Sequence, residues 1–178
     1  KYDRNGNITE IQRVPHKGST EKILKDTFQY DERNQLIREN SQSQDKTIVY
    51  AYDQGGNLKS VKEYAYTEGT LPETPVHEET GTYSSTWKDQ LLNWDGTAMT
   101  YDAVGNMLTR GDTVYTWTMG RKLACVDNGR KAQYFYDHTG SRVKKVVDGV
   151  ITNYHMAGDL LASETCNGGT TWYVYDSG

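Results

Sequence analysis

The chain has 178 residues, a formal net charge of −4 and a mean hydropathy of −0.84. Its apolar content depends on 14 Tyr and 4 Trp beside 17 Gly and only 3 Pro, a composition that favours strands and turns and so predicts an all-β fold. The sequence has no basic face for nucleic acid and no hydrophobic run long enough to cross a membrane, so it predicts neither a nucleic-acid partner nor a membrane span.

A repeated motif organises the chain: an aromatic residue is followed, six or seven positions on, by an aliphatic one, usually with Asp, Gly and Asn between them. A unit of this kind predicts a repeat architecture. In chain order the copies are Tyr2 with Asp3, Gly6 and Ile8; Tyr30 with Asp31, Asn34 and Leu36; Tyr52 with Asp53, Gly56 and Leu58; Tyr101 with Asp102, Gly105 and Met107; Trp117 with Arg121 and Leu123; Tyr136 with Asp137, Gly140 and Val143; Tyr154 with Gly158 and Leu160; and the start of another at Tyr175 and Asp176.

Each motif predicts a turn, because Asp can accept backbone N–H bonds at the first position while Gly three residues later adopts the left-handed conformation. Asn-Gly and Asp-Gly pairs alternate with these turns and predict tight hairpins in which both central residues have positive φ: Asn128–Gly129, Asp148–Gly149 and Asn167–Gly168. We therefore expect strands over 121–127, 131–136, 142–147, 150–156, 160–166 and 170–175, in an antiparallel meander of stacked β-hairpin repeats.

A second bulky residue lies two positions before most motif aromatics, and residues two apart share one face of a strand. The pairs are Phe28 with Tyr30, Tyr50 with Tyr52, Met99 with Tyr101, Tyr115 with Trp117, Tyr134 with Tyr136, and Tyr173 with Tyr175. Ladders of these rings, each worth on the order of 1.5–3 kcal/mol when buried, can replace an aliphatic core. The alternative is that the rings form a surface for stacking glycans.

One interval between motifs, from Tyr52 to Tyr101, is about twice the others. It predicts a division into repeats over 1–66, an inserted segment over 67–96 and repeats over 97–178, all within one continuous repeat domain. Residues 67–84 are rich in Glu, Pro and Gly and predict an exposed acidic loop. Thr86 and Asp89 then have capping-box spacing, which predicts a single short helix or a tight turn. Three roles for this loop stay open: a lid, a contact with a partner, or an exposed insertion without a function.

These motifs resemble the tyrosine-aspartate repeats of the Rhs family, which are shared with the shells of bacterial Tc toxins and with teneurins. The segment similar to large secreted bacterial Rhs or wall-associated proteins contains Ser85, Trp87, Lys88, Asp89, Leu91, Leu92, Asp95, Gly96, Tyr101, Asp102, Gly105, Asn106, Trp117, Gly120, Arg121 and Leu123. The resemblance implies a curved, twisted strip of a hollow β-shell that encloses a toxic carboxy-terminal region. Trp117 without Asp, His155 after Tyr154, and Arg142 in the aliphatic position depart from the pattern.

The sequence predicts no chemistry of its own: no catalytic, cofactor-binding or metal-binding residues. His16, His77, His138 and His155 share no ligand spacing, and the repeated Asp residues are explained by their turns. Cys125 and Cys166 fall four strand steps apart, roughly 19 Å, which is too far for a disulfide.

The leading functional hypothesis is a structural segment of a secreted or cell-surface protein. Its partners are then the neighbouring repeats, the conserved core and the enclosed toxin of a larger parent chain. The second hypothesis is an adhesion or carbohydrate-binding module that contacts glycans or surface proteins. A choline-binding wall anchor is a third, weakened because its paired aromatic signatures are absent apart from Trp172 and Tyr173.

Overall fold

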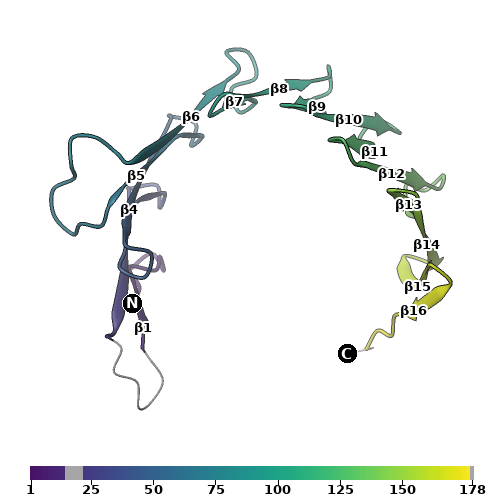
Figure 1. The fold of residues 1–178 in the computed structure, drawn as a ribbon, viewed down its shortest axis with the longest axis horizontal. Helices are drawn as coiled ribbons and strands as arrows, with labels where there is room; N and C mark the ends of the chain where they lie inside the picture. Colours follow the sequence, from purple (N-terminus) through teal and green to yellow (C-terminus); the bar gives the residue numbers. More distant parts are fainter. Residues whose placement is uncertain (15–21, 177–178) are drawn as a thin grey trace. The chain divides into compact units, whose positions relative to one another are not determined.

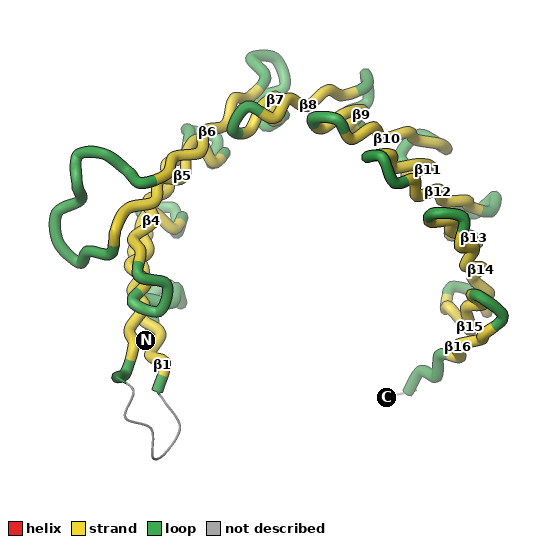
Figure 2. Tube along the Cα trace, viewed as in Figure 1, coloured by secondary structure: helices red, strands yellow, loops and turns green. Residues whose placement is uncertain are grey.

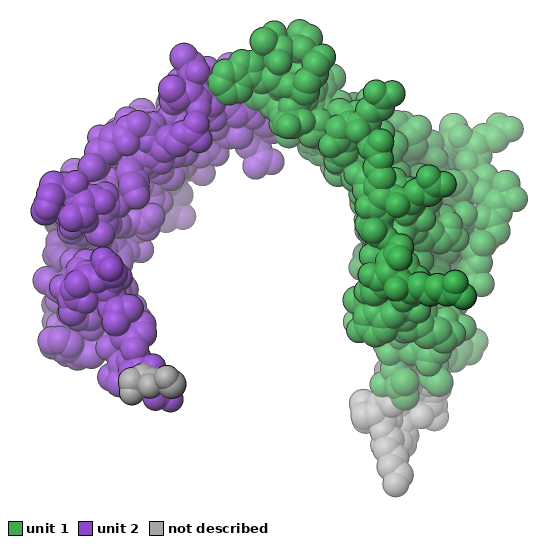
Figure 3. Space-filling view, turned by 180° about the vertical axis from the view of Figure 1, so that it is seen from behind, with its two compact units in different colours: residues 1–96 green, residues 97–178 purple. Residues whose placement is uncertain are grey.

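The computed structural model describes residues 1–14 and 22–176, and every regular element in them is a β-strand (Figure 2). The sixteen strands form an open antiparallel sheet in which the order in space follows the order in the sequence (Figure 1). This confirms the predicted all-β meander. The chain divides into two compact units, Lys1–Gly96 and Thr97–Gly178, which Figure 3 distinguishes by colour.

The first unit is a single layer of strands, each hydrogen-bonded to the next. They are β1 (Glu10–Arg13), β2 (Leu24–Tyr30), β3 (Leu36–Ser41), β4 (Lys46–Tyr52), β5 (Leu58–Ala65), β6 (His77–Tyr83) and β7 (Leu91–Trp94). The loop between β5 and β6 projects away from the sheet (Figure 1).

The second unit has the same single-layer construction. Its strands are β8 (Thr97–Tyr101), β9 (Met107–Arg110), β10 (Thr113–Thr118), β11 (Lys122–Asp127), β12 (Lys131–Tyr136), β13 (Arg142–Val147), β14 (Val150–Ala157), β15 (Leu160–Cys166) and β16 (Gly169–Trp172). The six strands expected from residue 121 onward are confirmed as β11 to β16, with ends that differ by one residue at most, except that the last strand stops at Trp172.

Two of the three predicted tight turns have positive φ at both central residues: Asp148 (49°) with Gly149 (82°), and Asn167 (50°) with Gly168 (78°). The prediction is wrong for Asn128, because only Gly129 has a positive φ there, at 90°. The turn from β11 to β12 is longer than two residues, and the Asn128 side chain accepts the N–H of Arg130 at 3.2 Å. That bond holds the turn without a left-handed Asn.

The prediction for the inserted segment is wrong in one respect, the extent of the acidic loop. Strand β6 begins at His77, inside the expected acidic loop, so the loop ends earlier than the composition suggests. Of the two alternatives predicted after that loop, a short helix or a tight turn, the turn is found, since the described residues between β6 and β7 contain no helix. The Ser84 hydroxyl oxygen accepts the N–H groups of Thr86 at 3.2 Å and Trp87 at 3.0 Å, which makes a turn.

A single layer leaves few side chains fully covered. Among the described residues only Tyr64 and Met99 are buried apolar side chains, at 7% exposure each. Burial alternates along β12, where Tyr134 and Tyr136 lie on the more covered face and Phe135 lies on the other. The expected pairing of rings on one face is therefore seen there, but the rings are half-buried, so each contributes less than full burial would.

A bulge recurs at the same place in seven hairpins of the described residues, whereas at the Tyr2 turn only an isolated bridge from Tyr2 to Ile8 forms. The motif aromatic pairs with the aliphatic residue across the turn. The residue just before the aromatic pairs with the residue two positions after that aliphatic one. One residue is thus extra on the second strand, which increases the local twist. Five pairs are aromatic–aliphatic: Tyr30–Leu36, Tyr52–Leu58, Tyr83–Leu91, Tyr101–Met107 and Trp117–Leu123. In the other two, Tyr136–Arg142 and Met156–Leu161, Arg142 takes the aliphatic position and Met156 the aromatic position.

Candidate functional site

The motif Asp closes its turn by accepting hydrogen bonds from the backbone. In the turn between β4 and β5, Asp53 Oδ1 accepts the N–H of Gly55 at 2.8 Å and the N–H of Asn57 at 2.9 Å. The Asp53 N–H in turn donates to the Asn57 carbonyl at 2.9 Å. The same arrangement, with donors two and four residues on, recurs at Asp3, Asp31, Asp102 and Asp137. The structure places these carboxylates as turn caps.

The residue three positions after the capping Asp has a positive φ in each of these turns. It is Gly6 (89°), Asn34 (62°), Gly56 (93°), Gly105 (86°) or Gly140 (84°). An L residue is strained in this conformation, and Asn tolerates it better than most, which explains why one copy of the motif can use Asn.

These hydrogen bonds lower the pKa of the Asp3 and Asp53 carboxyls in the first unit. At Asp3 the largest cause is the side-chain amide of Asn7, and at Asp53 it is the side-chain amide of Asn57, with backbone N–H groups adding to both. The donors stabilise the charged carboxylate and so keep it ionised to lower pH. A carboxylate held in this way has its lone pairs occupied by the turn.

The same direction holds for the two capping Asp residues of the second unit. The Thr139 hydroxyl is the largest cause of the lowered pKa of Asp137. At Asp102 partial burial acts to raise the pKa, but the backbone and side chain of Asn106 donate to the carboxylate and the net effect is a lower pKa.

The polar tip of the motif aromatic joins one repeat to the one before it. The Tyr136 hydroxyl donates to the Leu123 carbonyl at 2.8 Å, and the Trp117 indole N–H donates to the Met107 carbonyl at 2.7 Å. Each acceptor is the aliphatic residue of the preceding motif. The same bond runs from Tyr30 to Ile8, from Tyr52 to Leu36, from Tyr83 to Leu58 and from Tyr175 to Leu161, at 2.9–3.0 Å. We call this bond the ring clasp.

The ring clasp identifies a motif copy that the sequence analysis missed. Tyr83 donates to Leu58, pairs with Leu91 beside the recurrent bulge, and is followed by Ser84 in the place of Asp. The Ser84 N–H donates to the Gln90 carbonyl at 2.9 Å, as the capping Asp does in other turns. The double interval between Tyr52 and Tyr101 therefore contains a repeat with a longer turn. The available signal was a Tyr-Ser pair followed by Leu eight residues after the Tyr.

The bulge also corrects the assignment of Tyr154 as a motif aromatic. In β14 the register shift lies between His155 and Met156, so Met156 occupies the motif position and pairs with Leu161. Tyr154 lies two residues earlier, where Tyr134 lies in the preceding repeat. The predicted aliphatic partner Leu160 pairs with Ala157 instead, and Gly158, with a φ of 62°, is in the short turn beyond them.

The predicted residues at the ends of the array are less covered. Tyr2 forms an isolated bridge with Ile8 and is 71% exposed. Tyr175 is 51% exposed although its ring clasp to Leu161 is formed. Asp176 is the last residue that the structure describes.

Neighbouring turns are joined to one another along the margin of each unit. In the first unit the Asn7 amide donates to Asn34 Oδ1 at 2.8 Å, and the Arg33 guanidinium donates to the Gln54 carbonyl at 2.7 Å. In the second unit the Asn106 amide donates to the Gly120 carbonyl at 2.7 Å. The motif Asn thus holds its own turn through Asp and the next turn through its remaining N–H.

A buried polar cluster in the first unit was not predicted. Asp26 on β2 is 3% exposed and accepts hydrogen bonds from Ser41 Oγ at 2.9 Å, Ser43 Oγ at 2.9 Å, Ser43 N–H at 3.1 Å and Arg13 Nε at 3.2 Å. Burial acts to raise the pKa of Asp26, yet these donors outweigh it and the pKa is lowered. The buried polar atoms of the cluster all have hydrogen-bond partners, which indicates a structural role.

The start of the projecting loop is attached to the same part of the sheet. The Thr47 hydroxyl donates to the Thr67 carbonyl at 3.0 Å, and the Arg38 guanidinium donates to the carbonyls of Thr67 and Gly69, both at 2.9 Å. Thr47 is fully buried. These hydrogen bonds therefore fix the residues at which the loop leaves the sheet.

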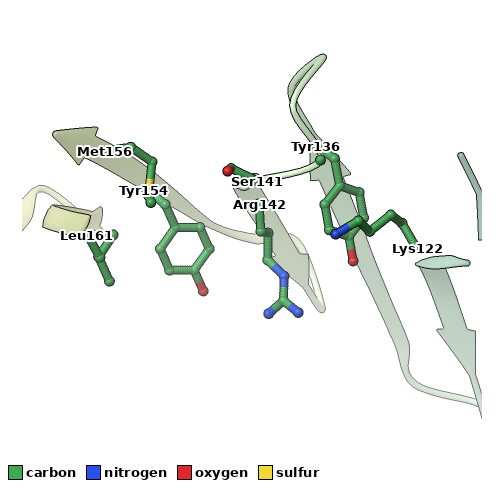
Figure 4. A pocket seen from close by; sticks show the side chains of 8 residues that line it. Lys122, Tyr136, Ser141, Arg142, Tyr154, Met156 and Leu161 are labelled. Atoms are coloured by element: carbon green, nitrogen blue, oxygen red, sulfur yellow. The ribbon is translucent and has the colours of Figure 1, made fainter. Parts of the chain in front are cut away.

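A ring-lined groove lies on the surface of the second unit. It has a volume of about 410 Å³ and lies among β11 to β15, with Tyr136, Arg142, Tyr154 and Leu161 side by side and Lys122 over the Tyr136 ring (Figure 4). Lys122 Nζ is 5.8 Å from the centre of that ring. Arg142 stacks on Tyr134, with its guanidinium carbon 4.7 Å from the ring centre. Rings and cations alternate along the groove.

Residues that could carry other chemistry are dispersed. His77 lies 3.2 Å from Glu79, and His155 lies 3.5 Å from the Thr165 hydroxyl; His16 is outside the described residues. In the part of the chain that the structure describes, no group of three or more His, Cys, Asp or Glu side chains could hold a metal ion. No helix in that part is long and apolar enough to cross a membrane.

Comparisons with known proteins follow the repeat pattern. The teneurin YD-shell family model matches residues 1–154. The tRNA nuclease WapA of Bacillus subtilis strain 168 and the tRNA3(Ser)-specific nuclease WapA of Bacillus spizizenii are each 32% identical over 159 residues, which is 84% of this chain. The chain spans only 6% of the length of either relative.

A solved structure with a TM-score above 0.5 supports the same fold. The Photorhabdus luminescens Tc holotoxin pore matches 92% of this chain and 10% of that chain, with 18% identity and a TM-score of 0.51. A crystal structure of TcdB2-TccC3 also matches 92% of this chain and 9% of that chain, with 14% identity and a TM-score of 0.47. Since the family model covers most of the chain and the motif turns, bulges and ring clasps recur throughout the described residues, the chain belongs to the teneurin YD-shell family.

Proposed function

We propose that the chain is a wall segment of a secreted or cell-surface YD-repeat protein, and that the wall encloses a toxic carboxy-terminal region of the same parent chain. The observation that carries this proposal is the ring clasp. The polar groups that recur in the repeat are used within the sheet, since the ring tips join each hairpin to the one before it and the carboxylates hold the turns. A surface built in this way extends a wall and leaves few groups for catalysis.

The motif carboxylates support a role without catalysis by this chain. A general acid or base must exchange a proton near its working pH, whereas hydrogen bonds lower the pKa of Asp3, Asp53, Asp102 and Asp137 and keep them ionised. Nuclease activity belongs to the WapA relatives by name, and this chain corresponds to 6% of their length.

A chimera tests the wall role. This chain replaces the matched segment of the Bacillus subtilis relative, and limited proteolysis follows the carboxy-terminal region of the purified protein. We expect that region to resist the protease as in the unaltered relative, whereas a variant that lacks the segment is cut quickly. Equal cutting of the chimera and the deletion variant would refute the wall role.

Adhesion is the competing outcome and has its own measurement. Glycan-array binding by the purified chain that disappears in Tyr134→Ala, while Phe135→Ala on the opposite face still binds, would favour a carbohydrate-binding module. We expect no saturable binding to the array.

A further inference from the structure

The ring clasp is missing at one junction within the second unit. Between the repeats that begin at Tyr136 and Met156, the aromatic of the later repeat is replaced by Met156, which has no hydroxyl. The aliphatic residue of the earlier repeat is replaced by Arg142. Within the described residues no side chain donates to the Arg142 carbonyl, which is the position that accepts the clasp in the other repeats.

The groove in Figure 4 lies at this junction. Met156 and Leu161 line one side, Tyr136 and Arg142 line the other, and the volume between them is about 410 Å³. Met156 lines the groove. Because a linear Met side chain fills less of this space than a phenol ring would, the substitution accounts for a groove at this junction. The ring position that other repeats fill from within the chain is here open to solvent.

The groove also carries positive charge without a counterion. Neither Lys122 nor Arg142 forms an ion pair with a carboxylate in residues 1–14 and 22–176. Both cations are exposed and lie over tyrosine rings. A negatively charged group that enters the groove would therefore form ion pairs with both Lys122 and Arg142, beside the tyrosine rings.

We propose that this groove is a docking site for a tyrosine side chain in an acidic segment of a partner protein. The partner's phenol ring occupies the vacant ring position, its hydroxyl donates to the Arg142 carbonyl, and flanking carboxylates pair with Lys122 and Arg142. The occupant is argued from the chain itself, since the equivalent position takes Tyr or Trp with the same donor geometry at Tyr136, Trp117 and Tyr175. The two cations favour a partner segment with acidic residues on either side of the tyrosine.

A short peptide tests the proposal directly. The probe has a central Tyr flanked on each side by two acidic residues, and binding to the whole chain is measured by nuclear magnetic resonance titration. Two control peptides replace the central Tyr by Phe or the acidic residues by Lys. We expect the Phe peptide to bind about fivefold more weakly, as loss of one hydrogen bond requires, and the Lys peptide to bind at least about tenfold more weakly.

Met156→Tyr is the decisive variant because it supplies the missing ring from within the chain. We expect it to raise the unfolding temperature and to abolish peptide binding. Val174→Tyr, at a position that is 95% exposed and does not line the groove, is the matched control and should leave both unchanged. Lys122→Gln removes the exposed cation over the Tyr136 ring and should weaken peptide binding about three- to tenfold while the chain stays folded.

Several results would overturn the proposal. These are equal affinity for the Tyr, Phe and Lys peptides, undiminished binding to a folded Met156→Tyr variant, or no saturable binding at millimolar peptide. An acidic oligosaccharide such as tri-galacturonate that binds in place of the peptide, and is lost in Lys122→Gln, would assign the groove to acidic sugars and reject a peptide partner.

Discussion

At the scale of single residues, the chain is held together by polar tips on apolar rings. A motif Tyr contributes contact area with its ring and a directed bond with its hydroxyl, so that the same side chain packs on one repeat and donates to another. This suits a single sheet layer, because half-buried rings alone give only part of the stabilisation of a closed core.

The contribution of one clasp can be measured in Tyr136→Phe. The variant keeps the ring and removes the donor to the Leu123 carbonyl, which is 2.8 Å away. We expect a loss of about 0.5–1.5 kcal/mol in the free energy of unfolding, the usual net value of one hydrogen bond, measured by urea denaturation. Tyr134→Phe on the same strand is the control, because no described residue hydrogen-bonds its hydroxyl, and it should change stability by much less.

The turn caps were predictable from sequence because Asp and Gly have specific roles in a turn. Asp53 and Gly56 are examples, since the carboxylate must accept N–H groups and the Gly must adopt a positive φ. The repeat at Tyr83 was missed because Ser84 caps it and its turn is longer, so neither the spacing nor the residue types match. Met156 was missed because only the strand register shows that it occupies a ring position.

At the scale of the elements, the hairpin is the unit, and its turn limits which residues are tolerated. Gly140 has a φ of +84°, and a Cβ placed there would lie 2.9 Å from Lys122 Cε. Gly120, in the turn between β10 and β11, has a similar φ of +79° with nothing within 4 Å of the added Cβ. The two positions separate backbone strain from contact with a neighbouring strand.

We expect Gly120→Ala to destabilise the chain by about 1–2 kcal/mol, the strain of a left-handed Ala. Gly140→Ala should cost more and should also move Lys122 away from the Tyr136 ring. Urea denaturation of both variants measures the difference. Equal losses would mean that Lys122 adjusts freely and that its place over the ring contributes nothing.

The strand order makes a further prediction about the cysteines. Cys125 is on β11 and Cys166 is on β15, both are free, and three strands separate those two. Strands lie about 4.8 Å apart, so the thiols are beyond the reach of a disulfide within one molecule. Alkylation of the denatured, unreduced protein should label both cysteines, and a mass that shows an internal bridge would contradict the strand order.

At the scale of the whole molecule, stability is spread along the chain and does not reside in a core. The buried side chains of the described residues are mostly polar, including Asp26, Asn40, Ser41 and Thr47, and their hydrogen bonds are satisfied. Such a chain depends on many small polar contributions, each of which responds to the solvent. Protonation of the carboxylates should therefore affect many turns at once.

The folded state lowers the pKa of the turn carboxyls Asp3, Asp53, Asp102 and Asp137 below their usual value of 3.8. Their contribution to stability is therefore fully present above the unfolded value and is lost as the pH falls through the lower folded values. We expect the urea midpoint to be flat above about pH 5 and to fall steeply below about pH 4.

A combined variant distinguishes these turns from other acid-sensitive groups. Replacing the four Asp residues by Asn keeps an oxygen acceptor in each turn but removes the charge, so the variant should be less stable than the parent at pH 7. The difference between the two proteins should narrow as the pH falls below the usual Asp value of 3.8, because the parent carboxyls then become neutral as well. A difference that stays constant from pH 7 to pH 3 would show that the charge of the caps adds nothing to stability, and that Asp serves the turn only as an oxygen acceptor.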